Sequence, residues 1–185
     1  TEFCNLLAHG LSANEIVERV KPDTDVIGIT NMFLHEWEFI RNFLKLLKKR
    51  HPNVTVVMGG ETATAWWEHM FEHCPELDIC VLGEGEEAMV DVLEKISERK
   101  SLNNCSSIAY RENNEIIKTQ RMARIKDINN IPLPAWDLFP VDNYLRYEFG
   151  SGVNRGRSLP MLSSRGCPFQ CTFCSSPEMW TTRYY

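Results

Sequence analysis

Three of the seven cysteines in this sequence lie close together near its C-terminus, at Cys167, Cys171 and Cys174. Thiolates at this spacing can converge from one loop, and as soft ligands they suit zinc or an iron–sulfur cluster. A structural zinc site usually takes four protein ligands, yet residues 159–185 contain no histidine and no further cysteine. Three cysteines on a [4Fe–4S] cluster instead leave one iron open. The spacing therefore favours iron–sulfur over zinc, and zinc stays as the alternative.

The other four cysteines are scattered along the chain, at Cys4, Cys74, Cys80 and Cys105. No secretory signal opens the sequence, because its first residues lack a basic region and a small-residue cleavage site. In such a chain, scattered cysteines are more often buried small hydrophobic residues than disulfides. We therefore expect a reducing, cytoplasmic location.

The composition is that of a folded soluble protein, with 43% hydrophobic and 24% charged residues. The net charge of −5 argues against nucleic acid as the main partner. No apolar run approaches the roughly 20 residues that a membrane-spanning helix needs, so no span is expected. The chain does not begin with Met, and we expect it to start inside a longer protein.

Strands and helices alternate in the first half of the chain. Continuous apolar runs predict buried strands at 26–30, 54–58 and 79–82. Helical periodicity and capping signals predict helices between them, and the first of these helices starts at the capping box Ser12-Ala13-Asn14-Glu15. This alternation predicts an α/β fold with a Rossmann-like, doubly wound parallel sheet.

The second half of the chain is organised differently. Runs at 108–111 and 116–120, on either side of an Asn-Asn turn, predict a hairpin. From 126 onward prolines and asparagines indicate a linker, and the apolar run 159–162 predicts one more strand. We therefore divide the chain into an α/β domain over 1–125, a linker over 126–158 and the beginning of a second domain over 159–185.

The sequence Ser-Ser-Arg-Gly-Cys-Pro-Phe-Gln-Cys-Thr-Phe-Cys at 163–174 resembles the cluster loop of the radical SAM superfamily. The resemblance implies that the three cysteines hold a [4Fe–4S] cluster whose open iron binds S-adenosylmethionine, which is cleaved to a 5′-deoxyadenosyl radical. It also implies that Phe173 packs beside the cluster and adenine, although a loop aromatic that only fills space is equally compatible. Only the first strand and cluster loop of that family's (βα) partial barrel are present, so we expect this truncated chain alone to be inactive.

The region from about Ser12 to Lys100 resembles the cobalamin (B12)-binding domains fused to radical SAM enzymes. The resemblance implies that Thr30 faces the lower-ligand tail of cobalamin and that Gly59 and Gly60 let the backbone pass close to it. It implies also that the turn 83–86 ends the last strand of this domain, and that the chain begins after the fold's first strand. All three turns follow strands, at the edge where open α/β sheets bind ligands.

One feature of many cobalamin domains is missing from this sequence. The Asp-x-His-x-x-Gly loop that supplies a histidine to cobalt does not occur, and His9-Gly10 does not fit that pattern. The remaining histidines (His35, His51, His69 and His73) are interpreted as surface residues.

Together these resemblances imply a cobalamin-dependent radical SAM enzyme, either a methyltransferase or an oxidative cyclase of the kind that acts on porphyrin esters. The implied cofactors are a [4Fe–4S] cluster, S-adenosylmethionine and cobalamin. The implied partners are a small-molecule substrate and a reductant such as flavodoxin or ferredoxin. No catalytic side chain can be assigned. Two alternatives stay open: a radical SAM enzyme whose front domain binds no cobalamin, and a non-catalytic zinc-binding module.

Overall fold

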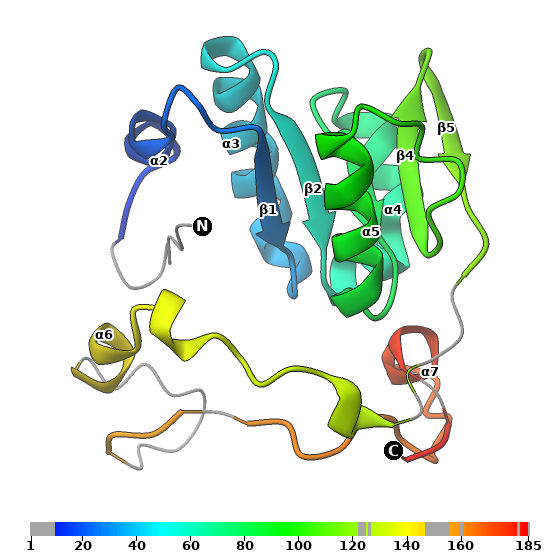
Figure 1. Ribbon diagram of the computed structural model, residues 1–185. Helices are drawn as coiled ribbons and strands as arrows, with labels where there is room; N and C mark the ends of the chain where they lie inside the picture. Colours follow the sequence, from blue (N-terminus) through cyan, green and yellow to red (C-terminus); the bar gives the residue numbers. More distant parts are fainter. Residues whose placement is uncertain are drawn as a thin grey trace.

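The computed structural model describes residues 10–121, 125, 127–146, 156–159, 161–180 and 182–184. Five strands form one sheet in the order β1-β2-β3-β4-β5 (Figure 1). Their bounds are β1 Val26–Thr30, β2 Thr55–Gly59, β3 Ile79–Val81, β4 Ile108–Glu112 and β5 Glu115–Lys118. The first three strands pair in parallel, and the last two are antiparallel to their neighbours.

Helices cover both faces of this sheet. On one face α3 (Trp37–Arg50) and α4 (Glu61–His73) pack behind the sheet as Figure 1 shows it, and α5 (Glu86–Ser97) lies in front of the other face. The short helix α2 (Ala13–Arg19) packs against α3. The buried side chains accordingly form two clusters, one with members from α2, α3 and α4 and one with members from α5. The predicted doubly wound α/β fold is confirmed.

Local sequence signals set the helix starts and the hairpin. The predicted capping box is present at α2: the Ser12 side chain accepts from the backbone N–H of Glu15, and the Glu15 carboxylate accepts from the backbone N–H of Ser12. In the hairpin, Asn113 and Asn114 both have positive φ, at 48° and 68°. Such a turn matches the twist of paired strands, and asparagine tolerates it well.

The hairpin is also where the sheet departs from the parallel expectation. Strand β4 lies antiparallel beside β3, with Cys80 opposite Ala109, so that the hairpin extends the parallel sheet. Residues 98–107, after α5, bring the chain back to the carboxyl end of β3, where the Leu82 N–H donates to Ser107 O at 2.7 Å, so β4 runs antiparallel to β3 and the sheet is mixed. The sequence predicted both the hairpin and the parallel strands but not their pairing.

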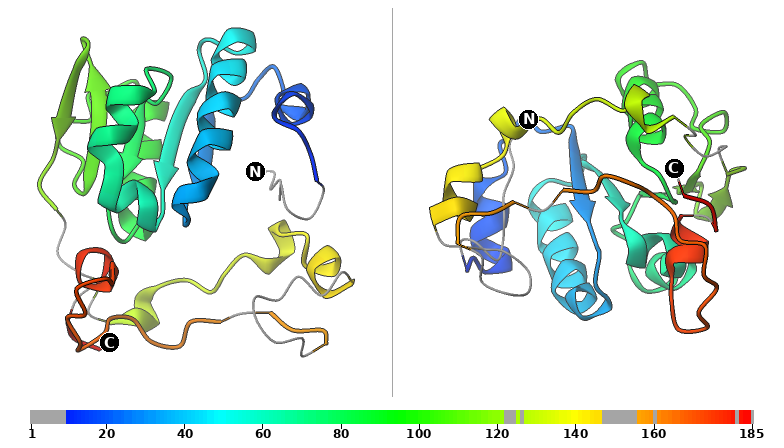
Figure 2. Two further views of the ribbon diagram at one scale, coloured as in Figure 1. Left: turned by 180° about the vertical axis from the view of Figure 1, so that it is seen from behind. Right: turned by 90° about the horizontal axis from the view of Figure 1, so that it is seen from below.

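In the C-terminal third of the chain, the described residues form only short helical elements. These are two 3-10 turns, η2 (Ile128–Asn130) and η3 (Trp136–Leu138), and the helices α6 (Val141–Arg146) and α7 (Ser176–Met179). The arrowheads of β1 and β2 point toward this part of the chain, which runs beneath the carboxyl ends of the strands (Figures 1 and 2). The segment after the sheet therefore lies at the edge where α/β folds bind ligands.

The strand predicted at 159–162 is wrong. Leu159, Met161 and Leu162 have no strand conformation, and residue 160 lies outside the described part of the chain. The side chains of Met161 and Leu162 are 79% and 81% exposed. A strand needs a neighbouring backbone to satisfy its N–H and C=O groups, and no described strand lies beside this run.

No helix in the described residues is long and apolar enough to cross a membrane.

Candidate functional site

Three loops at the carboxyl edge of the sheet are hydrogen-bonded to one another. After β1, the backbone N–H of Asn31 donates to Gly59 O at 2.8 Å, and its carbonyl accepts from the N–H of Thr62 at 3.1 Å. The Thr64 hydroxyl donates to Gly60 O at 2.8 Å and accepts from the Gly83 N–H at 2.9 Å. The loops after β1, β2 and β3 therefore form one connected surface.

Asn31 is the centre of this network, and sequence reasoning did not single it out. Its side chain is fully buried, and its amide group donates to Phe33 O at 2.9 Å and to the Glu36 carboxylate at 3.2 Å. Its Oδ1 atom has no hydrogen-bond partner in the described part of the chain. A buried acceptor without a partner is costly, and because the side chain is fully buried this atom is not exposed to a group bound at the surface.

Gly59 and Gly60, at the end of β2, differ in whether the fold requires glycine at that position. Gly60 has φ of +99°, and a Cβ built there would lie 2.6 Å from the Asn31 carbonyl oxygen. Gly60 is therefore required by the fold itself, because its backbone passes against the loop after β1. Gly59 has no such conflict, since the nearest atom to a built Cβ is the Val81 Cβ at 4.0 Å. The fold therefore leaves room for a Cβ atom at Gly59.

Small residues leave one face of the sheet uncovered near this edge. Alternate residues of a strand share a face, and Thr30 lies opposite Gly59 in the parallel register, so Thr30, Gly28 and Gly59 line one face. Gly28 and Thr30 are exposed, and the Thr30 hydroxyl has no partner among the described residues. A built Cβ on Gly28 would lie 3.9 Å from Met89 Cε, and on the same helix Val90 and Leu93 are 55% and 40% exposed. The result is an open apolar face beside a polar loop edge.

Arg165, two residues before the first clustered cysteine, ties the cysteine loop to the turn after β3. Its Nη1 donates to the Glu84 carboxylate at 3.0 Å, its Nη2 donates to the Glu86 carboxylate, and its guanidinium lies 5.2 Å from the ring centroid of Trp180. The side chains of Arg165 and Glu84 are only 17% and 9% exposed. Charge-assisted bonds to two carboxylates fix both position and orientation.

The electrostatics of this ion-pair group favour the charged forms. Burial alone would raise the pKa of Glu86, but the hydrogen bonds and charge of Arg165 outweigh it and the pKa is lowered. Burial likewise opposes the charge of Arg165, and its two carboxylate partners hold its pKa above the ordinary value. Both groups therefore stay ionised at neutral pH.

Two more contacts hold the segment that follows the cysteines. The Ser175 hydroxyl donates to the carboxylate of Glu61, the first residue of α4. Arg121, at the end of the hairpin, donates to the Met179 carbonyl at 3.1 Å. The cysteine loop is thus bracketed by attachments to the sheet domain on both sides.

Within the loop, the three cysteines are free thiols on or near the surface. Cys167 and Cys174 are partly buried and Cys171 is exposed. The Cys174 N–H donates to Cys171 O at 3.0 Å, and hydrogen bonds from Ser176 lower the pKa of the Cys174 thiol, which favours the thiolate. Three accessible thiols from one loop match the donor types of a three-cysteine iron–sulfur site, although their sulfur atoms do not all lie within 4.8 Å of one another in this structure.

The scattered cysteines contrast with these three, as predicted. Cys74, Cys80 and Cys105 are buried free thiols. Burial raises the pKa of Cys74 to about 12 and that of Cys105 to about 11. They are therefore packing residues and poor metal ligands. Cys4 lies outside the described residues.

The residues singled out from the sequence thus fall into two groups. Thr30, Gly59 and Gly60 come together at the carboxyl edge, beside Asn31. Cys167, Cys171 and Cys174 share the loop that Arg165 attaches to that edge. Phe173 does not pack in the described chain, because its side chain is 91% exposed, and Phe169 is 68% exposed.

Comparison with known proteins shows what this chain is similar to. Residues 5–93 match the model of the B12-binding domain. An uncharacterized methyltransferase of Pyrococcus horikoshii is 32% identical to the chain over 179 residues, which cover 96% of this chain and 37% of that protein. The anaerobic magnesium-protoporphyrin IX monomethyl ester cyclase of Cereibacter sphaeroides is 27% identical, over 96% of this chain and 29% of that protein. The chain is therefore similar to proteins that contain a B12-binding domain, and its residues 5–93 match that domain.

The structure of one such protein gives the same fold. The cobalamin-dependent S-adenosylmethionine radical enzyme OxsB, with aqua-cobalamin and S-adenosylmethionine bound, superposes with a TM-score of 0.72 at 22% identity. The match covers 91% of this chain and 22% of OxsB. This chain spans about a third of the length of the two relatives named above.

We predict that Arg165→Ala loosens the cysteine loop while the sheet stays folded. Charge-assisted hydrogen bonds contribute about 1.5–3 kcal/mol, so amide hydrogen exchange at Cys174, Met179 and Trp180, whose N–H groups are hydrogen-bonded within the segment, should speed up by roughly tenfold or more. Hydrogen exchange with mass spectrometry measures this, with the exposed Arg157→Ala as the matched control. Unchanged exchange in Arg165→Ala would show that the ion pairs do not hold the loop.

Proposed function

We propose that the protein is a radical S-adenosylmethionine enzyme that carries out methyl transfer or a tetrapyrrole-type oxidative cyclisation with the help of cobalamin. In this proposal Cys167, Cys171 and Cys174 hold a [4Fe–4S] cluster, and the loops after β1 and β2 hold cobalamin. The domain division is that of the sequence: a cobalamin-binding domain over 1–125, a linker over 126–158 and the beginning of the radical SAM domain over 159–185. The substrate is a small molecule, and a flavodoxin or ferredoxin supplies electrons.

The observation that carries this proposal is the attachment of the cysteine loop to the carboxyl edge of the sheet. Arg165 joins Glu84 and Glu86, and Ser175 joins Glu61, so that the loop lies at the same edge as Asn31 and Gly59. Two cofactors that must act on one substrate need such a shared space. A bound cluster with S-adenosylmethionine would supply a radical that activates a substrate carbon, and bound cobalamin would supply or accept the transferred group.

The protein's own residues have distinct tasks in this proposal. The thiol of Cys174, with its lowered pKa, is ready to give up its proton on ligation. Phe169 and Phe173, both largely exposed, provide apolar surface that would exclude water from the cluster. Residues Gly28, Thr30 and Gly59 provide a flat face for a planar tail, on which the exposed Thr30 side chain offers a hydroxyl group.

We expect the full-length parent protein, prepared without oxygen and reduced, to give a [4Fe–4S]⁺ EPR signal that shifts when S-adenosylmethionine is added. The shift follows because an open iron can take a further ligand. Cys171→Ala should abolish the signal, whereas Cys105→Ala, which removes a buried packing thiol, should keep it. Zinc in the metal analysis together with no iron signal would favour the non-catalytic module and contradict the enzyme.

Substitutions at Gly59 and Gly60 can test cofactor binding and folding separately. Gly59→Val has room in the fold but would fill the open face, so we expect the affinity for hydroxocobalamin to fall by roughly tenfold or more, the scale of an overpacked site. Gly60→Ala should instead lower the free energy of unfolding, by about 3 kcal/mol, because of its backbone conformation.

Equilibrium dialysis and denaturant unfolding measure these two effects, with Thr55→Ser at the other end of β2 as a control. If Gly59→Val binds hydroxocobalamin as well as the wild type does, the assigned face is wrong. If neither the wild type nor Gly59→Val binds hydroxocobalamin, the front domain is a scaffold without cobalamin, which is the alternative left open by the sequence.

A further inference from the structure

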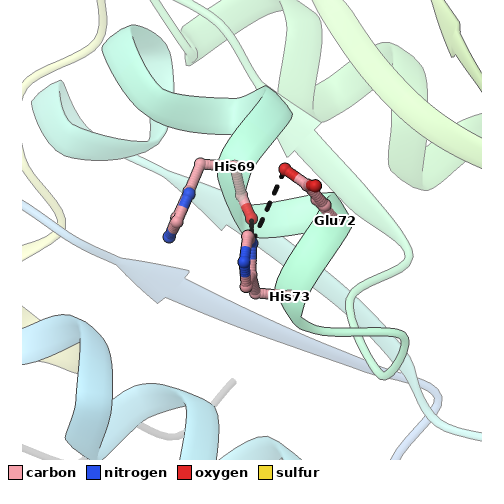
Figure 3. A group of neighbouring side chains, drawn as sticks. All are labelled: His69, Glu72 and His73. Atoms are coloured by element: carbon pink, nitrogen blue, oxygen red, sulfur yellow. Dashed lines mark hydrogen bonds and ion pairs between the residues drawn. The ribbon is translucent and has the colours of Figure 1, made fainter.

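The last two turns of α4 carry a cluster of side chains that the proposed function does not use. His69, Glu72 and His73 each offer a ligand atom, and these atoms all lie within 4.8 Å of one another (Figure 3). It is the only group of three or more His, Cys, Asp or Glu side chains in the described residues that could hold one metal ion. We propose that His69, Glu72 and His73 form a surface site for a divalent transition-metal ion that prefers imidazole ligands, such as Zn²⁺ or Ni²⁺.

The spacing of the residues supports this site. Two histidines four residues apart lie on one face of a helix, and the order His-x-x-Glu-His is one that helices use to bind metal ions. Figure 3 shows the three side chains gathered at the end of α4. The Glu72 side chain is 76% exposed and the His73 side chain 42% exposed, so they can rotate to close the remaining distance to an ion, which needs ligands at about 2.0–2.2 Å.

One hydrogen bond sets the tautomer of His73. Its Nδ1 lies 3.0 Å from the His69 carbonyl oxygen. Since a carbonyl can only accept, Nδ1 must be the donor, and the lone pair of the neutral ring is then on Nε2. Metal-binding histidines are commonly fixed in this way by a bond from the other ring nitrogen. Glu72, whose carboxylate lies 3.8 Å from His73 Nδ1, adds negative charge beside the ring.

The position on the helix also favours a cation. His73 is the last residue of the helical segment of α4 that follows a kink at Trp66, and the dipole is negative at this end of a helix. The neighbouring Cys74 does not compete as a ligand, because its side chain is fully buried.

The His69 ring also provides a signal for binding. It stacks on Trp66 with ring centroids 3.8 Å apart, and on His73 at 4.0 Å. An ion must lie in the plane of each imidazole that binds it, so the two stacked histidine rings have to turn apart to share one. Metal binding should therefore change the fluorescence of Trp66.

The test is a Ni²⁺ titration of the full chain without an affinity tag, with Cys167, Cys171 and Cys174 changed to serine so that the cluster thiols bind no nickel. We expect about one equivalent of Ni²⁺ to bind by calorimetry, and His69→Ala or His73→Ala to weaken binding at least tenfold, since each removes an imidazole ligand. Glu72→Gln should weaken it less. His35 is also exposed, so His35→Ala is the matched control and should bind Ni²⁺ as tightly as the chain without this change.

Fluorescence gives a second measurement that does not depend on how well the alanine variants fold. Trp66→Phe should lose the change in emission on adding Ni²⁺ but keep the calorimetric uptake. The proposal would be overturned if the chain with the three cluster cysteines changed to serine took up no Ni²⁺. It would also be overturned if Ni²⁺ uptake were unchanged in the His69→Ala/His73→Ala double variant of that chain.

Discussion

The ion pairs of Arg165 with Glu84 and Glu86 are the contacts on which the arrangement of the site depends. They join the turn after β3 to the loop that carries the clustered cysteines, across about eighty residues of sequence. Both carboxylates are held close to a guanidinium that is mostly shielded from water, where an unpaired charge would be costly. The turn and the loop therefore stabilise one another. Because Glu86 is also the first residue of α5, the orientation of the cysteine loop is coupled to the helix that covers one face of the sheet.

A second constraint acts at the other end of the same edge. Asn31 is buried between the loops after β1 and β2, and Gly60 can have only hydrogen where its backbone meets the Asn31 carbonyl. Thr64 extends this contact to Gly83 and so to the turn that holds Arg165. The edge is thus a continuous hydrogen-bonded rim from β1 to the cysteine loop. Because its loops are hydrogen-bonded to one another, none of them can move independently, and a rim of this kind holds a bound group in a fixed position.

Most of the fold could be predicted from the sequence, because its signals are local. Apolar runs located the parallel strands, the capping box located α2, and the Asn113-Asn114 turn located the hairpin. The pairing of β4 with β3 and the loss of the strand expected at 159–162 depend on which backbones meet in three dimensions, and no local pattern encodes that.

The candidate site, too, could be predicted only where its signals are local. Cysteine spacing and paired glycines can be recognised in a sequence, whereas Arg165 and its carboxylates lie far apart in the chain, and the unpartnered Oδ1 of Asn31 becomes evident only once the side chain is buried. The distinct roles of Gly59 and Gly60 likewise required the backbone geometry.

In the proposed function, this edge brings an iron–sulfur cluster and cobalamin into one space, and Arg165 holds the cluster loop against the cobalamin-binding edge. The most direct measurement is pulsed EPR of the dipolar coupling between a reduced [4Fe–4S]⁺ cluster and cob(II)alamin in the full-length parent protein, compared with Arg165→Lys. Lysine keeps the positive charge but cannot bridge two carboxylates as a planar fork does. We expect one well-defined dipolar coupling in the wild type and a broadened or weakened coupling in Arg165→Lys. Two cofactors that are both bound but show no coupling in the wild type, or an identical coupling in both proteins, would contradict it.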